Sequence, residues 1–371
     1  MLPVLIPADY LEACYAASYA EARKKFKQHA LDRQEHSVFR EFVYRQTGPA
    51  NEILSTDVAW LGAPSASRVL VLQSATHGVE GFAGSAIQID ALQLLATTAL
   101  PDDTAILLIH AINPFGFAWL RRVNEDGVDL NRNFVDFSQP LPINQAYAEL
   151  AEALLPVSDS DWPAANAQLA AYAQVHGQPA LERAVTGGQY QFAEGLFYGG
   201  LEATQSRRYL QTILQDFELK SRQQLAVVDI HTGLGPFGYG EMICDHAPAS
   251  VGVEWARRVY GQSVTEPALG SSSSVPKQGL VDYFWQDELG DRVCFVTLEF
   301  GTYNVEQMIE VLRRDHLLHR EKFKWDEPST QHVKQALKNN FYPATADWQE
   351  MVLLRGRQVI RQALLGLAET D

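Results

Sequence analysis

Residues 68–84 constrain the fold more than any other part of the chain. They read Arg-Val-Leu-Val-Leu-Gln-Ser-Ala-Thr-His-Gly-Val-Glu-Gly-Phe-Ala-Gly. An unbroken Val/Leu run that ends in small residues and glycines is typical of a buried parallel strand followed by a turn. Open α/β sheets place their chemistry at the carboxyl ends of such strands. The histidine and glutamate of this turn are therefore the first candidates for a functional site.

Further apolar runs alternate with segments of helical periodicity. Strands are expected at 38–46, 56–60, 68–74, 105–112, 225–231 and 293–300, and helices at 8–35, 83–95 and 279–288. This alternation predicts an α/β fold, with a central, mostly parallel (mixed) sheet flanked by helices.

Length alone would suggest two domains, but one catalytic α/β domain over residues 1–371 with an insertion fits as well. The chain is 46% hydrophobic and 20% charged, so it can bury a large core. Residues 140–215 are rich in Ala, Gln and Leu and predict a helical insertion, and residues 304–371 predict a helical C-terminal segment.

The charge and cysteine content exclude several classes of partner. A formal net charge of −15 without a polybasic run argues against nucleic acid or an anionic membrane. No apolar run reaches membrane-spanning length, and the N-terminus lacks the basic residues of a signal peptide. Three widely spaced cysteines favour a reducing compartment, and Cys294 lies in an apolar run and is expected to be a buried thiol. We expect a soluble, cytoplasmic protein, whose oligomeric state the sequence leaves open.

The ends of the expected strands carry the groups that a metal hydrolase needs. His77 and Glu80 follow one strand, His231 ends another, and Glu299 ends the last. Carboxyl ends of neighbouring parallel strands converge on one crevice. Two histidines and a glutamate are a standard ligand set for catalytic zinc, with a fourth position left for water. Glu299 is then the carboxylate available to take the proton of a metal-activated water.

Four motifs resemble the zinc carboxypeptidase superfamily in order and spacing. They are His-Gly-Val-Glu at 77–80, Gly-Val-Asp-Leu-Asn-Arg-Asn-Phe at 127–134, Asp-Ile-His at 229–231 and Thr-Leu-Glu-Phe-Gly-Thr at 297–302. The resemblance is closest to a bacterial branch of uncharacterised metallopeptidase-like proteins, related also to succinylglutamate desuccinylase and aspartoacylase. It spans about residues 65–305, with the insertion outside the shared core.

The resemblance implies the residues of a metal centre. His77, Glu80 and His231 match the ligands of one zinc ion per chain, and Glu299 matches the general base and acid. Asp129 matches the carboxylate that orients the first histidine ligand, a usual support for a metal-bound imidazole.

The resemblance also implies the residues that contact the substrate. Asn131 and Arg132 match the pair that holds the terminal carboxylate, a task that suits the arginine fork. Arg122 matches the arginine that polarises the scissile carbonyl. Arg121 is the less favoured candidate for that role, and is more simply an exposed neighbour.

Several points stay open in the sequence. Asp229 could orient His231 or be an unrelated buried acid. Classical carboxypeptidases carry a tyrosine on a mobile loop before the general base; here the corresponding spacing falls near Lys277, and Tyr283 is nearer. This departure weakens the similarity to true carboxypeptidases. The Gly/Ser-rich stretch 270–274 predicts a mobile lid or a plain linker, because no phosphate-loop signature follows it.

Three other histidines have simpler interpretations. His110 lies inside an apolar run and is expected to be a satisfied core residue. His316 and His319 are three residues apart on an expected helix and could bind a metal, but a solvated helix face is favoured.

The sequence therefore predicts a zinc-dependent hydrolase that cleaves an amide bond with metal-activated water. A metallocarboxypeptidase-like peptidase is favoured, acting on a peptide or acyl-amino acid with a free carboxylate. One alternative is an N-acyl amino acid deacylase or amidase of the desuccinylase type. An alternative of another class is an inactive metal-binding protein that uses the pocket for recognition.

Overall fold

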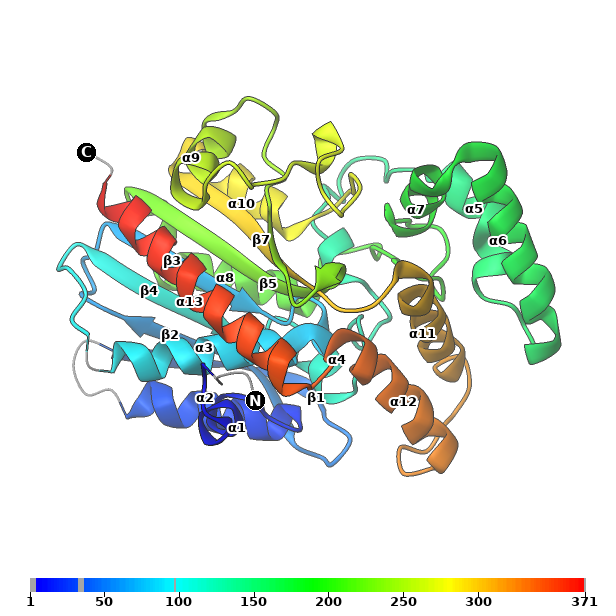
Figure 1. The fold of residues 1–371 in the computed structure, drawn as a ribbon, viewed down its shortest axis with the longest axis horizontal. Helices are drawn as coiled ribbons and strands as arrows, with labels where there is room; N and C mark the ends of the chain where they lie inside the picture. The colour runs from blue at the N-terminus through cyan, green and yellow to red at the C-terminus, as the bar shows by residue number, and fades with distance from the viewer. Residues whose placement is uncertain (1–4, 33–36, 97, 370–371) are drawn as a thin grey trace.

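A mixed sheet of seven strands forms the centre of the computed structural model, which describes residues 5–32, 37–96 and 98–369 (Figure 1). Its spatial order is β1-β2-β4-β3-β5-β7-β6. The strands are β1 (Ser37–Thr47), β2 (Ile53–Leu61), β3 (Arg68–Ser74), β4 (Thr104–His110), β5 (Gln224–Phe237), β6 (Gly240–Ile243) and β7 (Val293–Gly301). The central strands β4, β3, β5 and β7 are parallel, and β1, β2 and β6 pair antiparallel with their neighbours. The predicted α/β class and mixed sheet are confirmed; the short strand β6 was not expected.

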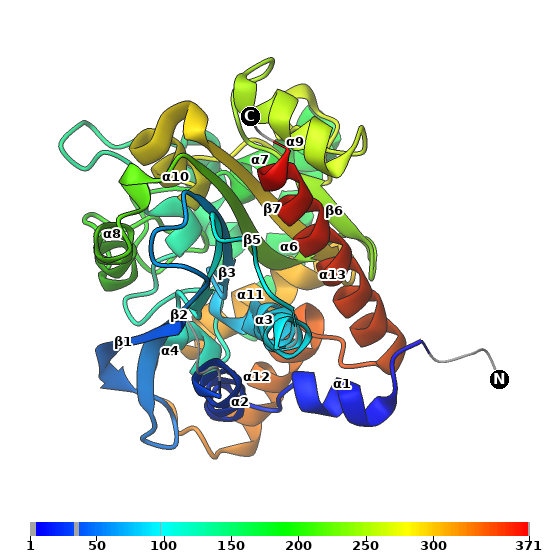
Figure 2. The same ribbon diagram turned by 90° about the vertical axis from the view of Figure 1, so that its left-hand side faces the viewer.

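Helices cover both faces of this sheet. The α-helices are α1 (Ala8–Cys14), α2 (Tyr19–Leu31), α3 (Gly81–Leu95), α4 (Pro114–Ala118), α5 (Gln145–Leu154), α6 (Trp162–His176), α7 (Gln178–Thr186), α8 (Gln205–Asp216), α9 (Val251–Tyr260), α10 (Val281–Leu289), α11 (Val305–Leu318), α12 (Pro328–Phe341) and α13 (Ala346–Ala368). Figure 2 shows α8 and α10 on one side of the sheet and α3 and α13 on the other.

Side-chain alternation along the strands produces the two faces. Successive residues of a strand point to opposite sides, so Leu70 and Leu72 of β3 join the core under α1, α2, α3, α9 and α13. Val69 and Val71 of the same strand join the second core, under α8 and α10. Both sides of β3 are thus buried, as its unbroken apolar run predicted.

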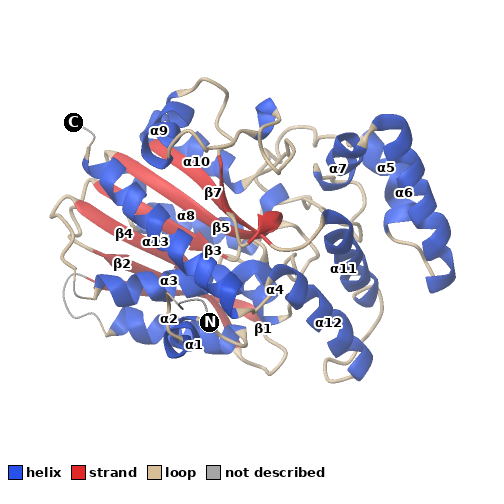
Figure 3. Ribbon diagram, viewed as in Figure 1, coloured by secondary structure: helices blue, strands red, loops and turns tan. Residues whose placement is uncertain are grey.

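A third group of helices extends beyond the sheet. Helices α5, α6, α7, α11 and α12 lie to one side of it in Figure 3. Their apolar side chains form a separate core that includes Tyr147, Leu312 and Phe341. Val79, from the turn after β3, is part of this same core, so the helical group packs directly against the turn that carries His77 and Glu80.

The N-terminal helix differs from expectation. Instead of one helix over 8–35, the chain forms α1 and α2, separated by residues 15–18, and residues 33–35 lie outside the described part. Ser18 explains the break, because its backbone is extended and its side chain accepts a hydrogen bond from the amide of Glu21, the usual N-cap arrangement. In the described ranges, no helix is long and apolar enough to cross a membrane.

Close backbone packing fixes the turn after β3. A Cβ atom on Gly78 would lie 2.1 Å from the carbonyl carbon of Gly116 in α4. The amides of Gly78 and Val79 donate to the carbonyl oxygens of Arg122 and Arg121, at 3.2 and 2.8 Å. The glycine therefore allows two chain segments to touch directly beside His77.

We expect Gly78→Ala to destabilise the protein by about 1–3 kcal/mol, the usual range for overpacking, because the added Cβ atom clashes with backbone that cannot rotate away. Since this turn carries His77 and Glu80, the same change should weaken metal binding. Thermal unfolding and metal titration measure the two effects. Gly48→Ala is the matched control, since its added Cβ meets only the flexible end of the Glu52 side chain. An unchanged melting temperature for Gly78→Ala would contradict the packing argument.

Candidate metal site

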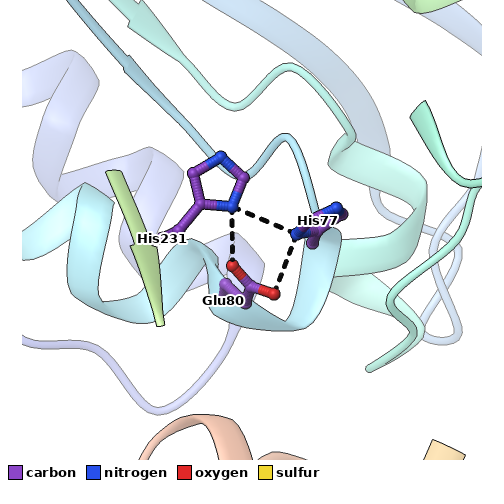
Figure 4. A group of neighbouring side chains, drawn as sticks. All are labelled: His77, Glu80 and His231. Carbon is purple, nitrogen blue, oxygen red and sulfur yellow. Dashed lines mark hydrogen bonds and ion pairs between the residues drawn. The ribbon is translucent and has the colours of Figure 1, made fainter. Parts of the chain in front are cut away.

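Three buried side chains from two strand ends converge on one point (Figure 4). His77 precedes the short 3-10 turn Gly78–Glu80 after β3, Glu80 ends that turn, and His231 lies on β5. The Nδ1 atom of His77 is 2.9 Å from Glu80 Oε1. The Nδ1 atom of His231 is 3.0 Å from Glu80 Oε2 and 3.1 Å from His77 Nδ1. The structure therefore brings together the three residues predicted to bind the metal.

The outer nitrogen of each imidazole faces a buried carboxylate. His77 Nε2 lies 3.2 Å from Asp129 Oδ1, and His231 Nε2 lies 2.6 Å from Asp229 Oδ2. The Nη2 atom of Arg122 lies 2.7 Å from the same His77 Nε2. Asp229 also accepts a hydrogen bond from the hydroxyl of Thr76 at 3.0 Å. Asp229, whose role the sequence left open, thus contacts His231 as Asp129 contacts His77.

These carboxylates prepare the group for a metal ion. An imidazole that donates its outer N–H to a carboxylate, as His231 can to Asp229, keeps a lone pair on its other nitrogen for a metal. At His77 the outer nitrogen has both Asp129 and the guanidinium of Arg122 beside it. Here the two Nδ1 atoms and the Glu80 carboxylate all face the same point. Ligand atoms of a tetrahedral zinc site, with bonds of about 2.0–2.1 Å, lie roughly 3.3 Å apart, close to the distances between these atoms. The donor set fits a divalent cation.

The pKa values reflect the strong coupling within this group. Burial alone would raise the pKa of Glu80, but the His77 charge and hydrogen bonds from His231 and His77 outweigh burial and lower it. Burial alone would lower the pKa of His231, but Asp229 and Glu80 outweigh burial and raise it well above its usual value. The carboxylates therefore favour positive charge at this point.

Glu299 lies next to the group on the neighbouring strand. It is the register partner of His231 in the pairing of β5 with β7. Its side chain is only 8% exposed, and its Oε1 accepts a hydrogen bond from the Leu234 amide at 2.9 Å. Burial, and then the negative charge of Glu80, raise the pKa of Glu299 to about 7. A buried carboxyl group at this position can both accept and return a proton.

Arg122 donates hydrogen bonds to two of the carboxylates around the candidate metal site. Its Nε donates to Asp129 Oδ2 at 3.0 Å and its Nη1 donates to Glu80 Oε1 at 3.3 Å. Its guanidinium also lies over the ring of Phe197, 5.1 Å from the centroid. Arg122 lines the pocket beside the metal group, so its position allows contact with a bound molecule as well.

Arg121 is buried, so its interpretation as an exposed neighbour of Arg122 is wrong. Its Nε donates to Asp315 Oδ2 at 2.9 Å, and Asp315 also accepts from the ammonium of Lys334 at 2.6 Å. His319 Nε2 lies 2.7 Å from the same ammonium, and His316 is buried. The solvated helix face expected for the two histidines is therefore also wrong. The expected core position of His110 is confirmed: it is fully buried, and its Nε2 lies 2.9 Å from the Ser85 hydroxyl. The residue is only half satisfied, because its Nδ1 has no hydrogen-bond partner among the described residues.

Asn131 and Arg132 line the same pocket, but internal hydrogen bonds already engage both. The side-chain oxygen of Asn131 accepts from the Val281 amide at 2.8 Å. The Nε and Nη2 atoms of Arg132 donate to the carbonyl oxygen of Thr186, at 3.1 and 2.7 Å. Thr186 is the last residue of α7, so the end of this helix holds the Arg132 side chain in place.

Further charged side chains of the pocket were missed or left open by the sequence. Glu182, Asp245, Lys277 and Asp282 line it together with the metal group. Of these, only Lys277 was indicated by the sequence, through its spacing before Glu299. Glu182 lies in α7, Asp245 in a loop and Asp282 at the start of α10, and none of the three belongs to a recognisable motif. Tyr283 does not line the pocket, and its hydroxyl instead donates to the carbonyl oxygen of Lys277 at 3.2 Å.

Solved structures with the same fold are carboxypeptidases or related proteins. Carboxypeptidase A from Helicoverpa armigera matches with a TM-score of 0.55 and 13% identity, over 97% of this chain and 75% of that one. The thrombin-activatable fibrinolysis inhibitor matches with a TM-score of 0.50 and 11% identity, over 99% of this chain and 78% of that one. The protein therefore has the carboxypeptidase fold, which confirms the resemblance to that superfamily at the level of fold.

Within this fold, the chain belongs to the family described as "Protein of unknown function (DUF2817)", whose model matches residues 15–355. No curated protein matches the sequence.

We expect the purified protein to bind about one zinc ion per chain, and His77→Ala to lose it, because two ligands rarely hold zinc. Metal analysis after dialysis measures this directly. His332→Ala, on the exposed side of α12, is the control and should keep the wild-type content. Equal zinc in all three proteins, or none in a folded wild type supplied with zinc, would contradict the site.

Asp229→Asn should weaken zinc affinity about 10- to 100-fold, the usual effect of removing the carboxylate behind a ligand imidazole. The fold should survive, since asparagine has nearly the same shape. Competition with a chelator of known affinity measures the change, and an affinity equal to that of the wild type would show that Asp229 does not support His231.

Proposed function

We propose that the protein is a zinc-dependent hydrolase that cleaves an amide bond. The observation that carries the proposal is the position of Glu299, a buried carboxyl group paired in register with His231, beside the His77, Glu80 and His231 group. A structural metal site needs no such neighbour. A hydrolytic site needs a group that takes a proton from water and returns it to the leaving nitrogen.

The residues divide this work between them. His77, Glu80 and His231 would hold a zinc ion, which would supply the Lewis-acid chemistry that activates water and polarises the scissile carbonyl. Glu299 accepts the proton of the attacking water, with its Oε1 fixed by the Leu234 amide. It then transfers this proton to the amine that leaves. Arg122, already at the edge of the pocket, stabilises negative charge on the carbonyl oxygen.

We propose a peptide or acyl-amino acid with a free carboxylate as the substrate, and therefore a metallocarboxypeptidase-like peptidase. Arg132 supports this choice, since a buried guanidinium in the same pocket favours an anionic group. The carboxypeptidase fold is consistent with it.

An N-acyl amino acid deacylase or amidase is the second candidate. Glu182, Thr186 and Phe197, all from the segment between β4 and β5, form part of the pocket wall. A pocket bounded on this side favours a compact acyl-amino acid over a long peptide. Comparing acylated single amino acids with longer peptides distinguishes the two activities.

We place the protein in the cytoplasm and expect no nucleic-acid partner. All three cysteines are free and buried, which fits a reducing compartment. The formal charge of −15 opposes binding to nucleic acid.

Glu299→Gln tests the proposal against an inactive, metal-binding recognition protein. We expect turnover of N-acetyl amino acids and short peptides to fall about 10²- to 10⁴-fold, because the amide cannot accept a proton, while zinc content stays at the wild-type level. Glu321→Gln, at an exposed position, is the control and should turn over normally. A Glu299→Gln variant as active as the wild type, or a zinc-loaded wild type without hydrolase activity on the whole panel, would reject the proposal.

A further inference from the structure

Two cations share the pocket without an acidic partner. Arg132 is fully buried and Lys277 is half-buried, and both line the pocket that contains the metal group. The hydrogen-bond partners of both are neutral. Lys277 donates to the hydroxyl of Ser274 and to the carbonyl oxygen of Val275, and Arg132 donates to the carbonyl oxygens of Thr186 and Asn131. Among the described residues, no carboxylate oxygen lies within the 4.0 Å of an ion pair from either cation.

Both cations keep hydrogen-bond donors for another molecule. An ammonium has three N–H donors and a guanidinium has five. Lys277 uses two of its donors in the bonds just described, and Arg132 makes three such bonds. A buried charge with unused donors and no ion-paired carboxylate, such as Arg132, is costly, and a bound anion would reduce that cost and also pair with the half-buried Lys277.

The same short segment holds both cations in position. The carbonyl oxygen of Thr186 accepts from the Arg132 guanidinium, and the carbonyl oxygen of the next residue, Gly187, accepts from the Gln278 amide, next to Lys277. Tyr283 fixes the carbonyl oxygen of Lys277 itself. A Cβ atom on Gly279 would lie only 2.3 Å from the carbonyl oxygen of Arg132. The backbones carrying the two cations therefore touch.

Electrostatics support this closeness. Burial lowers the pKa of Lys277, and the positive charge of Arg132 lowers it further, to about 8, against the raising effect of Asp245, Glu299 and Glu182. The positive charge of Arg132 therefore acts unfavourably on the Lys277 ammonium. An anion between them would relieve this repulsion and strengthen both interactions.

We propose that Lys277, together with Arg132, binds the terminal carboxylate of the substrate and so selects free acids over their amides. The inference deepens the proposed function and rests on it. Lys277 then determines specificity in this site: its ammonium reaches the substrate from the segment before α10, and Arg132 supplies further donors in the same pocket.

Paired substrates test the inference. The zinc-loaded full-length protein is assayed with the N-acetyl derivatives of alanine, leucine and aspartate, each as the free α-acid and as the α-amide. We expect Lys277→Met to lower kcat/KM for the acids about 10- to 100-fold, the usual effect of losing a charge-assisted hydrogen bond, mainly through KM. The amides should change less than about 3-fold, because they carry no charge for the ammonium.

Two further variants serve as controls. Lys277→Arg keeps the charge and should recover most of the activity on free acids. Lys324→Met makes the same chemical change at a side chain that is 85% exposed, and should match the wild type on both substrate series. Equal losses on acids and amides in Lys277→Met, or no loss on either, would overturn the role of Lys277.

A binding measurement separates failure of this inference from failure of the proposed hydrolase. Calorimetric titration of the metal-free protein with the same acids and amides requires no turnover. Binding of an acid but not its amide, lost in Lys277→Met, supports the carboxylate site even if no hydrolysis is found. Equal binding of acid and amide by the wild type overturns it even if the enzyme hydrolyses both.

Discussion

Compensation of buried charge at the carboxyl ends of β3, β5 and β7 is the constraint on which the site depends. Glu80, Asp129, Asp229 and Glu299 are all almost completely buried within this region. Isolated carboxylates at such depth are costly, so each has a partner: an imidazole, a guanidinium, a hydroxyl or a backbone amide. The buried carboxylates leave an environment that favours positive charge between His77, Glu80 and His231, and a divalent cation would supply that charge.

A second buried charge group extends this constraint to the C-terminal helices. Asp315 of α11 holds Arg121 on one side and Lys334 of α12 on the other. The backbone carbonyl oxygens of Arg121 and Arg122 accept hydrogen bonds from the amides of the turn that carries Glu80. The hydroxyl of Thr232, next to His231, donates to the carbonyl oxygen of Phe341 at the end of α12. Both ligand-bearing segments are therefore braced by helices that lie far along the chain.

The sequence predicts local patterns well and side-chain partners poorly. The apolar run before His77 and the long motif around Asp129 specify a strand end and a turn, so the fold and the three converging metal-binding candidates could be recognised. Arg121 and His319 were misjudged because their partners are Asp315 and Lys334, whose packing leaves no local pattern. The four-residue strand β6 was missed because its pairing with β7, not its own sequence, makes it a strand. Roles assigned by resemblance to Asn131, Arg132 and Arg122 remain predictions.

The sequence distance between the ligands has a consequence for how the protein folds. His77 and His231 are 154 residues apart, so an unfolded chain that held one ion with both would lose the entropy of a long closed loop. A metal ion at this site would therefore favour the folded chain, and its binding free energy would add to folding stability. In this respect the ion would act as a reversible cross-link between β3 and β5, and metal supply would contribute to the stability of the folded protein as well as to its chemistry.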